Sequence, residues 1–217
     1  MNGCWQEGTI RGSHGSVQSR GRIVKLGGSL LTRPTWPDDI TALLTSLAHR
    51  SVTAAAVIVV GGGPVVDGLR AVDRAARRPP ALMHDLAIEA MRLTARIVAD
   101  ALGLPIVTTI DSDTTGPTIL DAGTWLATSG AGSGVPHGWD ATSDSIAAVV
   151  AAATGREILL AKSVPPPCSG DDLQGLAAAG WVDEFFPTAA ASLGRIAWAS
   201  PGIANAPGLR HGQRIRS

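Results

Sequence analysis

The chain has 217 residues, of which 45% are hydrophobic and 17% charged, a composition that favours a packed globular domain over disorder. Its 18 basic and 18 acidic residues balance, which excludes a long-range field that would recruit nucleic acid or an anionic membrane surface. The two cysteines show neither metal-type spacing nor a secretory context, and no apolar stretch reaches membrane-spanning length, so we expect a cytoplasmic protein without a membrane partner.

The first twenty residues are rich in glycine and serine and carry no hydrophobic periodicity, so residues 1–20 are predicted to be a disordered extension. We expect a single domain over residues 21–217. The elements predicted in its first half are a strand at Ile23–Leu26, a helix from Pro37 to about His49, a buried strand in AAAVIVV (54–60), and two helices at Val65–Arg78 and Leu82–Leu102 that are separated by two prolines.

The second half continues the alternation of strands and helices. The expected elements are a strand at Pro105–Thr109, a helix or strand in ILDAGTWLAT (119–128), a glycine-rich loop at 129–138, a helix from Asp144 to about Ala153, a strand in REILLAKS (156–163), a short helix in DDLQGLAAAG (171–180) and a strand in RIAWAS (195–200). This order predicts an α/β fold with a mostly parallel sheet covered on both faces. Ligands of such sheets bind beyond the carboxyl ends of the strands.

Two glycine clusters fall at those strand ends. Gly27 and Gly28 follow the first strand beside Lys25, and a run of three glycines at 61–63 follows the second strand and leads into a helix. Neither cluster spells a P-loop or a complete dinucleotide motif. Each alone is typical of a plain turn, and a lysine at a strand end commonly extends to solvent. Together they favour an anion site, because bare backbone and a helix N-terminus both bind anions.

Three stretches, VKLGGSLL, VIVVGGGPVVDGLR and GWDATSDSIAAVVAAATGREILLAKSV, together resemble the amino acid kinase superfamily in their order and spacing. A weaker echo follows at GWVDEFFP. The resemblance implies a three-layer α/β/α sandwich around a mostly parallel sheet. It also implies an acceptor half at about 21–135 and a nucleotide half at about 136–205.

The resemblance also implies roles for particular residues. Lys25 and Asp144 would be catalytic, with Lys25 neutralising the phosphoryl group in transfer and Asp144 organising lysines rather than acting as a base. The residues expected near the nucleotide phosphates are Gly27, Gly28, Ser29, Lys162 and Ser163, and those expected on the acceptor side are Gly61, Gly62 and Gly63. The implied cofactors are ATP and Mg²⁺. The metal would be held by phosphates and water, so no metal-ligating residues are predicted.

The acceptor is less defined by the residues. The chain looks most like the small branch that includes aminomethylfuran phosphate kinase of one-carbon cofactor synthesis, which implies a phosphomonoester acceptor and a diphosphate product. The alternatives are a carboxylate kinase giving an acyl phosphate, a non-catalytic nucleotide- or oxyanion-binding member of the fold, and an unrelated nicotinamide-dependent enzyme. Family analogy implies a homo-oligomer, although the apolar face of residues 82–102 could equally be internal core.

Four further acceptor-side candidates each have a structural alternative. His84 could cap a helix or face water, Arg92 could form a surface ion pair with Asp85, Trp139 could only pack, and Asp140 could cap the next helix. Three charged residues of the preceding helix are expected on a solvated face, namely Asp67, Asp73 and Arg74.

Overall fold

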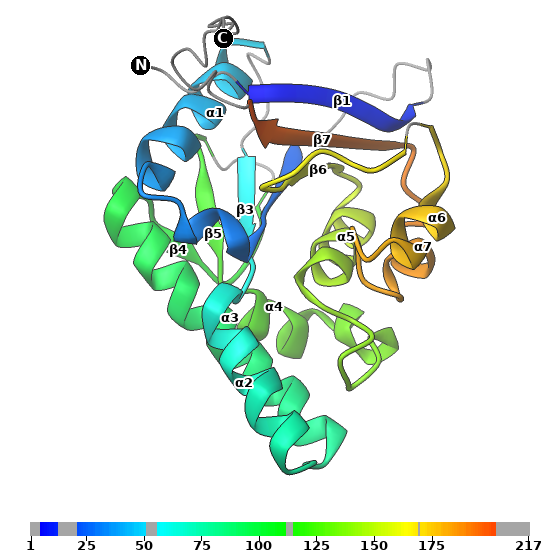
Figure 1. The fold of residues 1–217 in the computed structure, drawn as a ribbon. Coiled ribbons are helices and arrows are strands. Elements are labelled where there is room, and N and C mark those ends of the chain that lie inside the picture. Colours follow the sequence, from blue (N-terminus) through cyan, green and yellow to red (C-terminus); the bar gives the residue numbers. More distant parts are fainter. Residues whose placement is uncertain (1–4, 13–20, 51–55, 112–114, 169, 203–217) are drawn as a thin grey trace, which may run out of the picture.

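The computed structural model describes residues 5–12, 21–50, 56–111, 115–168 and 170–202 (Figure 1). These residues form a seven-stranded sheet of order β1-β7-β6-β2-β3-β5-β4, in which every pairing is parallel except that of β1 with β7. The strands are β1 (Trp5–Gly12), β2 (Arg22–Leu26), β3 (Ala56–Val60), β4 (Ile106–Val107), β5 (Thr118–Leu120), β6 (Glu157–Ala161) and β7 (Arg195–Pro201).

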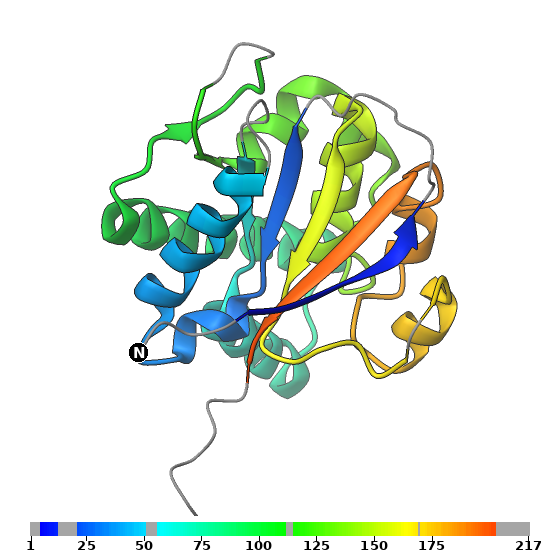
Figure 2. The same ribbon diagram turned by 90° about the horizontal axis from the view of Figure 1, so that it is seen from above.

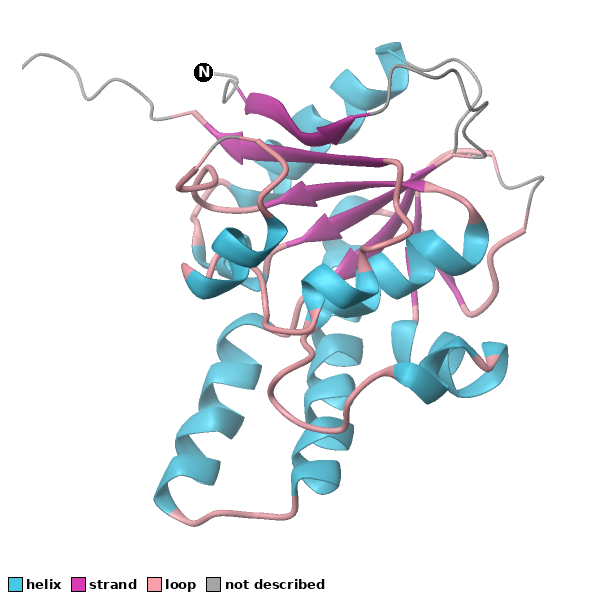
Figure 3. Cartoon of the chain, turned by 90° about the vertical axis from the view of Figure 1, so that its right-hand side faces the viewer, coloured by secondary structure: helices cyan, strands magenta, loops and turns pink. Residues whose placement is uncertain are grey.

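Helices cover both faces of this sheet, as Figures 1 and 2 show. The described helices are η1 (Gly28–Thr32), α1 (Trp36–Arg50), α2 (Gly63–Ala75), α3 (Pro80–Leu102), α4 (Ala122–Ser129), η2 (Ala131–Gly134), α5 (Ser143–Thr154), α6 (Leu173–Ala178) and α7 (Phe186–Ala189). The pair α2–α3 projects away from the sheet (Figure 3). The mostly parallel, three-layer α/β architecture that the sequence predicts is therefore confirmed.

Alternation along the central strands divides the core into two clusters. Ile23, Val57 and Ile158 point into one cluster with α4, α5, α6 and α7. Their sequence neighbours Val24 and Ile58 point into the other cluster, with η1, α1 and α3. Successive side chains of a strand face opposite sides, so each central strand supports both layers. Lys25 has the same parity as Ile23 and therefore faces α5.

The first described strand corrects the expectation for residues 1–20. Residues 5–12 form β1, which pairs antiparallel with β7 from Trp5↔Pro201 to Gly12↔Arg195. The indole Nε1 of Trp5 donates to the Asp39 carbonyl at 2.8 Å. Only one side chain of β1, Ile10, is fully buried, so its hydrophobic pattern is too weak to mark a strand. Residues 1–4 and 13–20 lie outside the described residues.

Other elements differ from the predictions mainly in extent. The segment 119–128, for which both helix and strand were open, is both: β5 ends at Leu120 and α4 begins at Ala122. Asp121 caps α4 by accepting from the Thr124 amide at 3.0 Å. The strand expected at 105–109 is reduced to the two residues of β4. Among the described helices, none is long and apolar enough to span a membrane.

Candidate active site

The two glycine turns lie against each other at the carboxyl edge of the sheet. The ends of β2, β3 and β6 are in register, since Leu26 pairs with both Val60 and Ala161. The Gly27 amide donates to the Ala161 carbonyl at 2.7 Å, which engages this donor within the sheet edge. A Cβ on Gly28 would come within 3.0 Å of backbone atoms of Gly63, which itself has φ +52°. The turns after β2 and β3 therefore form one surface of bare backbone.

Replacing Gly28 by alanine should consequently separate the two turns. Because the added methyl group meets backbone rather than a movable side chain, we expect the free energy of unfolding to fall by about 1–3 kcal/mol. Urea unfolding would measure this. Gly68→Ala is the matched control: that glycine lies within α2 with open space around its Cβ position, so alanine should be neutral or slightly stabilising. Equal effects of the two substitutions would contradict the close approach.

Lys25, Asp144 and Lys162 form a buried cluster beside these turns. The Lys25 Nζ lies 2.7 Å from Oδ1 of Asp144, and the Lys162 Nζ lies 2.7 Å from Oδ2 of the same carboxylate. The side chains are 5%, 7% and 14% exposed for Lys25, Asp144 and Lys162 respectively. Lys162 follows β6 with the parity of Ile158 and Leu160, which face α5. Strand alternation thus directs both lysines toward the first turn of α5, where Asp144 lies.

Burial and charge act in opposite directions within this cluster. Burial by itself raises the pKa of Asp144, but attraction to Lys25 and Lys162 outweighs burial and places that pKa below its ordinary value. Burial, followed by repulsion from Lys25, lowers the pKa of Lys162 to about 8. Asp144 is therefore ionised and Lys162 largely protonated near pH 7, giving two ammonium groups held by one carboxylate.

Two hydroxyl groups join the turn after β2 to the segment after β6. The Ser29 Oγ lies 3.0 Å from the Ser163 Oγ. Lys162, which precedes Ser163, also donates to the Trp181 carbonyl and lies 4.8 Å from the centroid of the Trp181 ring. The residues predicted to surround the nucleotide phosphates are therefore close together in space, and their roles stay a prediction.

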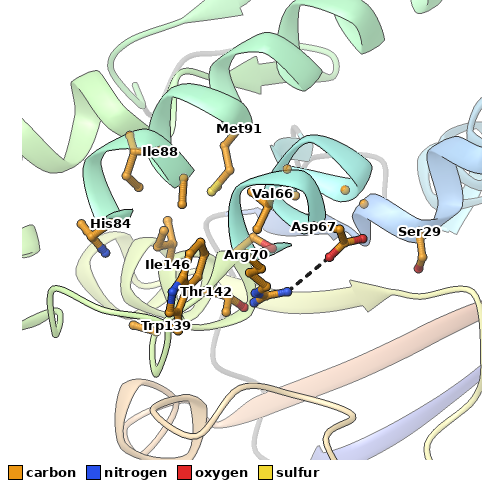
Figure 4. Close-up of a pocket in the computed structure, with 17 residues that line it drawn as sticks. Ser29, Val66, Asp67, Arg70, His84, Ile88, Met91, Trp139, Thr142 and Ile146 are labelled. Carbon is orange, nitrogen blue, oxygen red and sulfur yellow. Dashed lines mark hydrogen bonds and ion pairs between the residues drawn. The ribbon is translucent and has the colours of Figure 1, made fainter. Parts of the chain in front are cut away.

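A cavity of about 210 Å³ opens beside the glycine turns, between α2, α3 and the first turn of α5 (Figure 4). It is lined by Gly28, Ser29, Gly61, Gly62, Gly63, Val66, Asp67, Arg70, His84, Ala87, Ile88, Met91, Trp139, Ala141, Thr142, Ser143 and Ile146. The lining combines the ion pair of Arg70 with Asp67, the glycine backbone and several hydroxyl groups with an apolar wall. This arrangement suits a small anionic ligand with an apolar body.

The cation of this cavity, Arg70, was not singled out from the sequence. Its guanidinium lies 5.1 Å from the centroid of the Trp139 ring, and one of its nitrogens lies 3.5 Å from Oδ1 of Asp67 (Figure 4). The indole Nε1 of Trp139 in turn donates to Asp73 at 3.0 Å. Arg70 follows the three glycines by about two helical turns, and this spacing is the signal that could have identified it.

Asp73 corrects the expectation of a solvated face on α2. It is 4% exposed and accepts from Trp139 and, at 2.9 Å, from the Arg78 amide. These hydrogen bonds, that from Trp139 first, lower the pKa of Asp73. The carboxylate fixes the loop that carries Trp139 against the end of α2. Arg74, by contrast, is exposed as predicted, and Asp67 is exposed at the rim of the cavity.

The other acceptor-side candidates divide into two groups. His84 is 8% exposed, lines the cavity and stacks on His137 with ring centroids 4.8 Å apart. Burial, and then the proximity of His137, lower the pKa of His84.

Arg92 instead pairs with Asp121 at 3.0 Å and Glu89 at 2.7 Å, and Asp140 is exposed. Arg92 and Asp140 do not line the cavity. The structural alternative for Arg92, an ion pair, is what the structure shows, but its partners are Asp121 and Glu89 rather than Asp85.

The number of lysines in the sequence is a further indication of the cluster. The whole sequence has 18 basic residues, of which only Lys25 and Lys162 are lysines and the rest are arginines. Both lysines are in the buried cluster. A chain that uses arginine for every other cation therefore places its compact, strongly hydrated ammonium groups only where the two strands end.

Comparisons with known proteins find a family model and solved structures of the same fold. A family model described as "Amino acid kinase family" matches residues 21–166. The crystal structure of UMP kinase from Ureaplasma parvum has a TM-score of 0.54 and 17% identity, covering 80% of this chain and 84% of that one. That of uridylate kinase from Archaeoglobus fulgidus has a TM-score of 0.47 and 18% identity, covering 66% of this chain and 64%, just under two thirds, of that one. Comparison with curated protein sequences gives no match.

Proposed function

Because the chain belongs to the amino acid kinase family, we propose that it is an ATP-dependent kinase that phosphorylates a small anionic metabolite. The observation that carries this proposal is the buried cluster of Lys25, Asp144 and Lys162 beside the glycine turns. Two ammonium groups lie at the carboxyl ends of β2 and β6, next to a cavity with its own cation. They can neutralise the charge that accumulates when a phosphoryl group moves between two oxygens.

The residues of the cluster fit a nucleotide donor by their chemistry. The turn at Gly28 leaves backbone where a side chain has no room, and the hydroxyl groups of Ser29 and Ser163 lie 3.0 Å apart in the segments that follow β2 and β6. Bound ATP would supply the phosphoryl group, with Mg²⁺ held by its phosphates and water. Asp144 has an ammonium group at each oxygen and a lowered pKa. It therefore positions the lysines and is not placed to take a proton from the acceptor.

The cavity favours a compact acceptor. Its volume of about 210 Å³ lies below the roughly 300–1,000 Å³ that is typical of sites for larger ligands. Arg70 and the glycine turns offer donors to an anionic group, while Ile88, Met91 and Ile146 offer apolar contact. These features support a phosphomonoester with a small apolar or planar body, converted to a diphosphate, as in the aminomethylfuran phosphate kinase branch. A carboxylate acceptor giving an acyl phosphate is the alternative.

An acceptor panel tests the reaction directly. The purified chain would be mixed with ATP and Mg²⁺ and with small phosphomonoesters, UMP or small amino acid carboxylates. We expect ADP release to depend on a small phosphomonoester, and the product to show the coupled ³¹P resonances of a diphosphate. Hydroxylamine trapping of an acyl phosphate would instead identify a carboxylate kinase. Binding of ATP without turnover for every acceptor would favour a non-catalytic member of the fold.

Replacing Arg70 by alanine should weaken acceptor binding specifically. A hydrogen bond to a charged group contributes about 1.5–3 kcal/mol, so we expect KM for the acceptor to rise on the order of 10- to 100-fold, with a smaller change in KM for ATP. Steady-state kinetics would measure both. Arg74→Ala removes the same charge from α2 at an exposed position outside the cavity and should change neither. An unchanged acceptor KM in Arg70→Ala would remove Arg70 from the site.

The exposed stripe of α3 supports a further proposal, that the chain self-associates. Leu82, Leu86, Leu93 and Ile97 are between 38% and 55% exposed and lie on one side of the helix. In a dimer with two-fold symmetry such a stripe would meet the same stripe of a second copy, which would cover its apolar side chains. The stripe is separate from the cavity, whose α3 residues face the other way.

A further inference from the structure

The segment between α6 and α7 contacts the first turn of α5, which carries Asp144. Oδ2 of Asp183 accepts from the Thr142 amide at 3.0 Å, from the Thr142 hydroxyl at 2.7 Å and from the Ser145 amide at 3.1 Å. Oδ1 of Asp183 accepts from the Ser145 hydroxyl. These partners lie 38–41 positions away in sequence. A remote carboxylate therefore caps the helix.

The cap has an unusual division of roles. Thr142 is the N-cap residue of α5, yet its own side chain makes no capping bond to the helix. The amides of the N-cap and of the third helical residue, Ser145, both donate to Asp183 instead. In a capping box, two residues of the helix itself satisfy such amides reciprocally. In this protein the single side chain of Asp183 accepts from both amides. The position of the first turn of α5 therefore depends on where Asp183 is held.

The same segment holds the second lysine. The carbonyl of Trp181, two residues before Asp183, accepts from the Lys162 Nζ, and the Trp181 indole donates to the Val164 carbonyl at 3.1 Å. Asp144 lies between Thr142 and Ser145, the two residues that Asp183 fixes. Residues 181–183 thus contact both the turn that carries the bridging carboxylate and one of the ammonium groups that it bridges.

We propose that Asp183 is a positioning residue, which holds the first turn of α5 so that the Asp144 carboxylate stays between Lys25 and Lys162. This inference rests on the proposed role of that cluster in phosphoryl transfer. Asp183 does not touch the acceptor cavity; it acts through Asp144. Phosphoryl transfer depends mainly on placement, and a displacement of about 1 Å can cost on the order of 100-fold in rate.

Lysine-selective ¹³C labelling gives a readout that does not need activity. The sequence contains only two lysines, so the spectrum contains two lysine Cε signals, which a Lys162→Arg variant assigns. In the unaltered chain the Lys162 signal should titrate near pH 8. Asp183→Ala should lower the pKa of Lys162 further, because a displaced Asp144 leaves the buried ammonium without its carboxylate. It should also reduce kcat by 10-fold or more.

Asp183→Asn separates position from charge. An asparagine Oδ1 in place of Oδ2 can still accept from both amides through its two lone pairs, and its Nδ2 in place of Oδ1 can donate to the Ser145 hydroxyl. The charge of Asp183 is the weakest of the contributions that raise the pKa of Lys162. We therefore expect Asn to keep kcat within about 3-fold, consistent with a retained cap, and to shift the Lys162 titration less than Ala does. Glu184→Ala removes the exposed neighbouring acid and should change neither quantity.

Three outcomes would overturn the proposal. In the first, folded Asp183→Ala, checked by circular dichroism at the assay temperature, keeps both the lysine titration and kcat, which makes Asp183 a stabilising cap only. In the second, Asn behaves as Ala does, which makes charge rather than hydrogen bonding the cause. In the third, Glu184→Ala has the same effect as Asp183→Ala. If no acceptor is turned over even by the unaltered chain, the proposed function fails while the titrations still decide the role of Asp183.

Discussion

Replacing Lys25 by alanine is expected to lower kcat by on the order of 100-fold or more, because it removes one of the two ammonium groups at the strand edge where phosphoryl transfer is proposed. A single preorganised donor to developing charge typically has an effect of this size. The side chain is 5% exposed and its Nζ lies 2.7 Å from Oδ1 of Asp144, whereas the Lys162 Nζ pairs with the other carboxylate oxygen. ADP release in the presence of ATP, Mg²⁺ and the acceptor would measure the loss.

The folded state should tolerate this substitution. Asp144 keeps Lys162 as a partner at 2.7 Å, so the buried carboxylate is not left uncompensated. Arg96→Ala, which removes an exposed cation from α3, is the control for a general effect of lost charge and should retain full activity. If Lys25→Ala is folded and retains most of its activity, Lys25 has no part in the reaction, and the proposed function loses its main support.

Replacing Asp144 by alanine should have the largest effect on stability. It leaves two buried ammonium groups facing each other without the carboxylate that separates them. Breaking a buried ion pair by removing one partner costs about 3–5 kcal/mol, and here two pairs share the partner. We expect a loss in the free energy of unfolding of at least this size near pH 6, measured by urea unfolding, together with loss of activity.

The loss in the free energy of unfolding of Asp144→Ala should depend on pH in a defined direction. The pKa of Asp144 is lowered on folding, so its stabilising contribution is present above the ordinary carboxyl value of about 3.9 and is lost as the pH falls below it. In the variant, the pKa of Lys162 should fall below about 8, because the carboxylate that raises it is absent. The folded variant then binds fewer protons than the folded unaltered chain over this range. The difference in the free energy of unfolding between the two proteins should therefore shrink from pH 6 to pH 9.5.

An exposed ion pair provides the comparison. Asp171 pairs with Arg11 at 2.9 Å, but the Asp171 side chain is 49% exposed, and exposed pairs contribute about 0–1 kcal/mol. Asp171→Ala should therefore have a small effect at either pH. A loss in Asp144→Ala that is the same at pH 6 and pH 9.5 would show that lost packing, rather than the buried charges, determines its stability.

The parts of the fold that local patterns specify could be predicted from the sequence. The run 56–60 is apolar throughout and Ile23–Leu26 is apolar except for Lys25. Both runs end at glycine, which is typical of central parallel strands, and the structure places both there. Parallel strands bring their carboxyl ends to one edge, so the meeting of the two glycine turns followed from the strand order. The resemblance to a family then added Asp144 and Lys162, which the structure brings to Lys25.

The parts that depend on distant partners could not be predicted. β1 has one fully buried side chain and is a strand because β7 lies beside it. Asp73 lies on a helix face that reads as polar, but the Trp139 loop covers it. Asp183 caps a helix about forty positions earlier in the chain. Periodicity reports which side of an element is apolar, and it contains no information about which loop later folds over the polar side.

The antiparallel pairing of β1 with β7 matters for anyone who shortens this chain. The family match begins at residue 21, and trimming to that boundary would delete β1. The outer backbone groups of residues 195–201 would then face solvent as an open sheet edge, which is a ready template for a strand from another molecule. Residues 5–12 cover that edge, and β1, which is then the outer strand, has a register shift between Thr9 and Arg11 that makes it a poorer template. Fusions or cleavage sites are therefore better placed before residue 5.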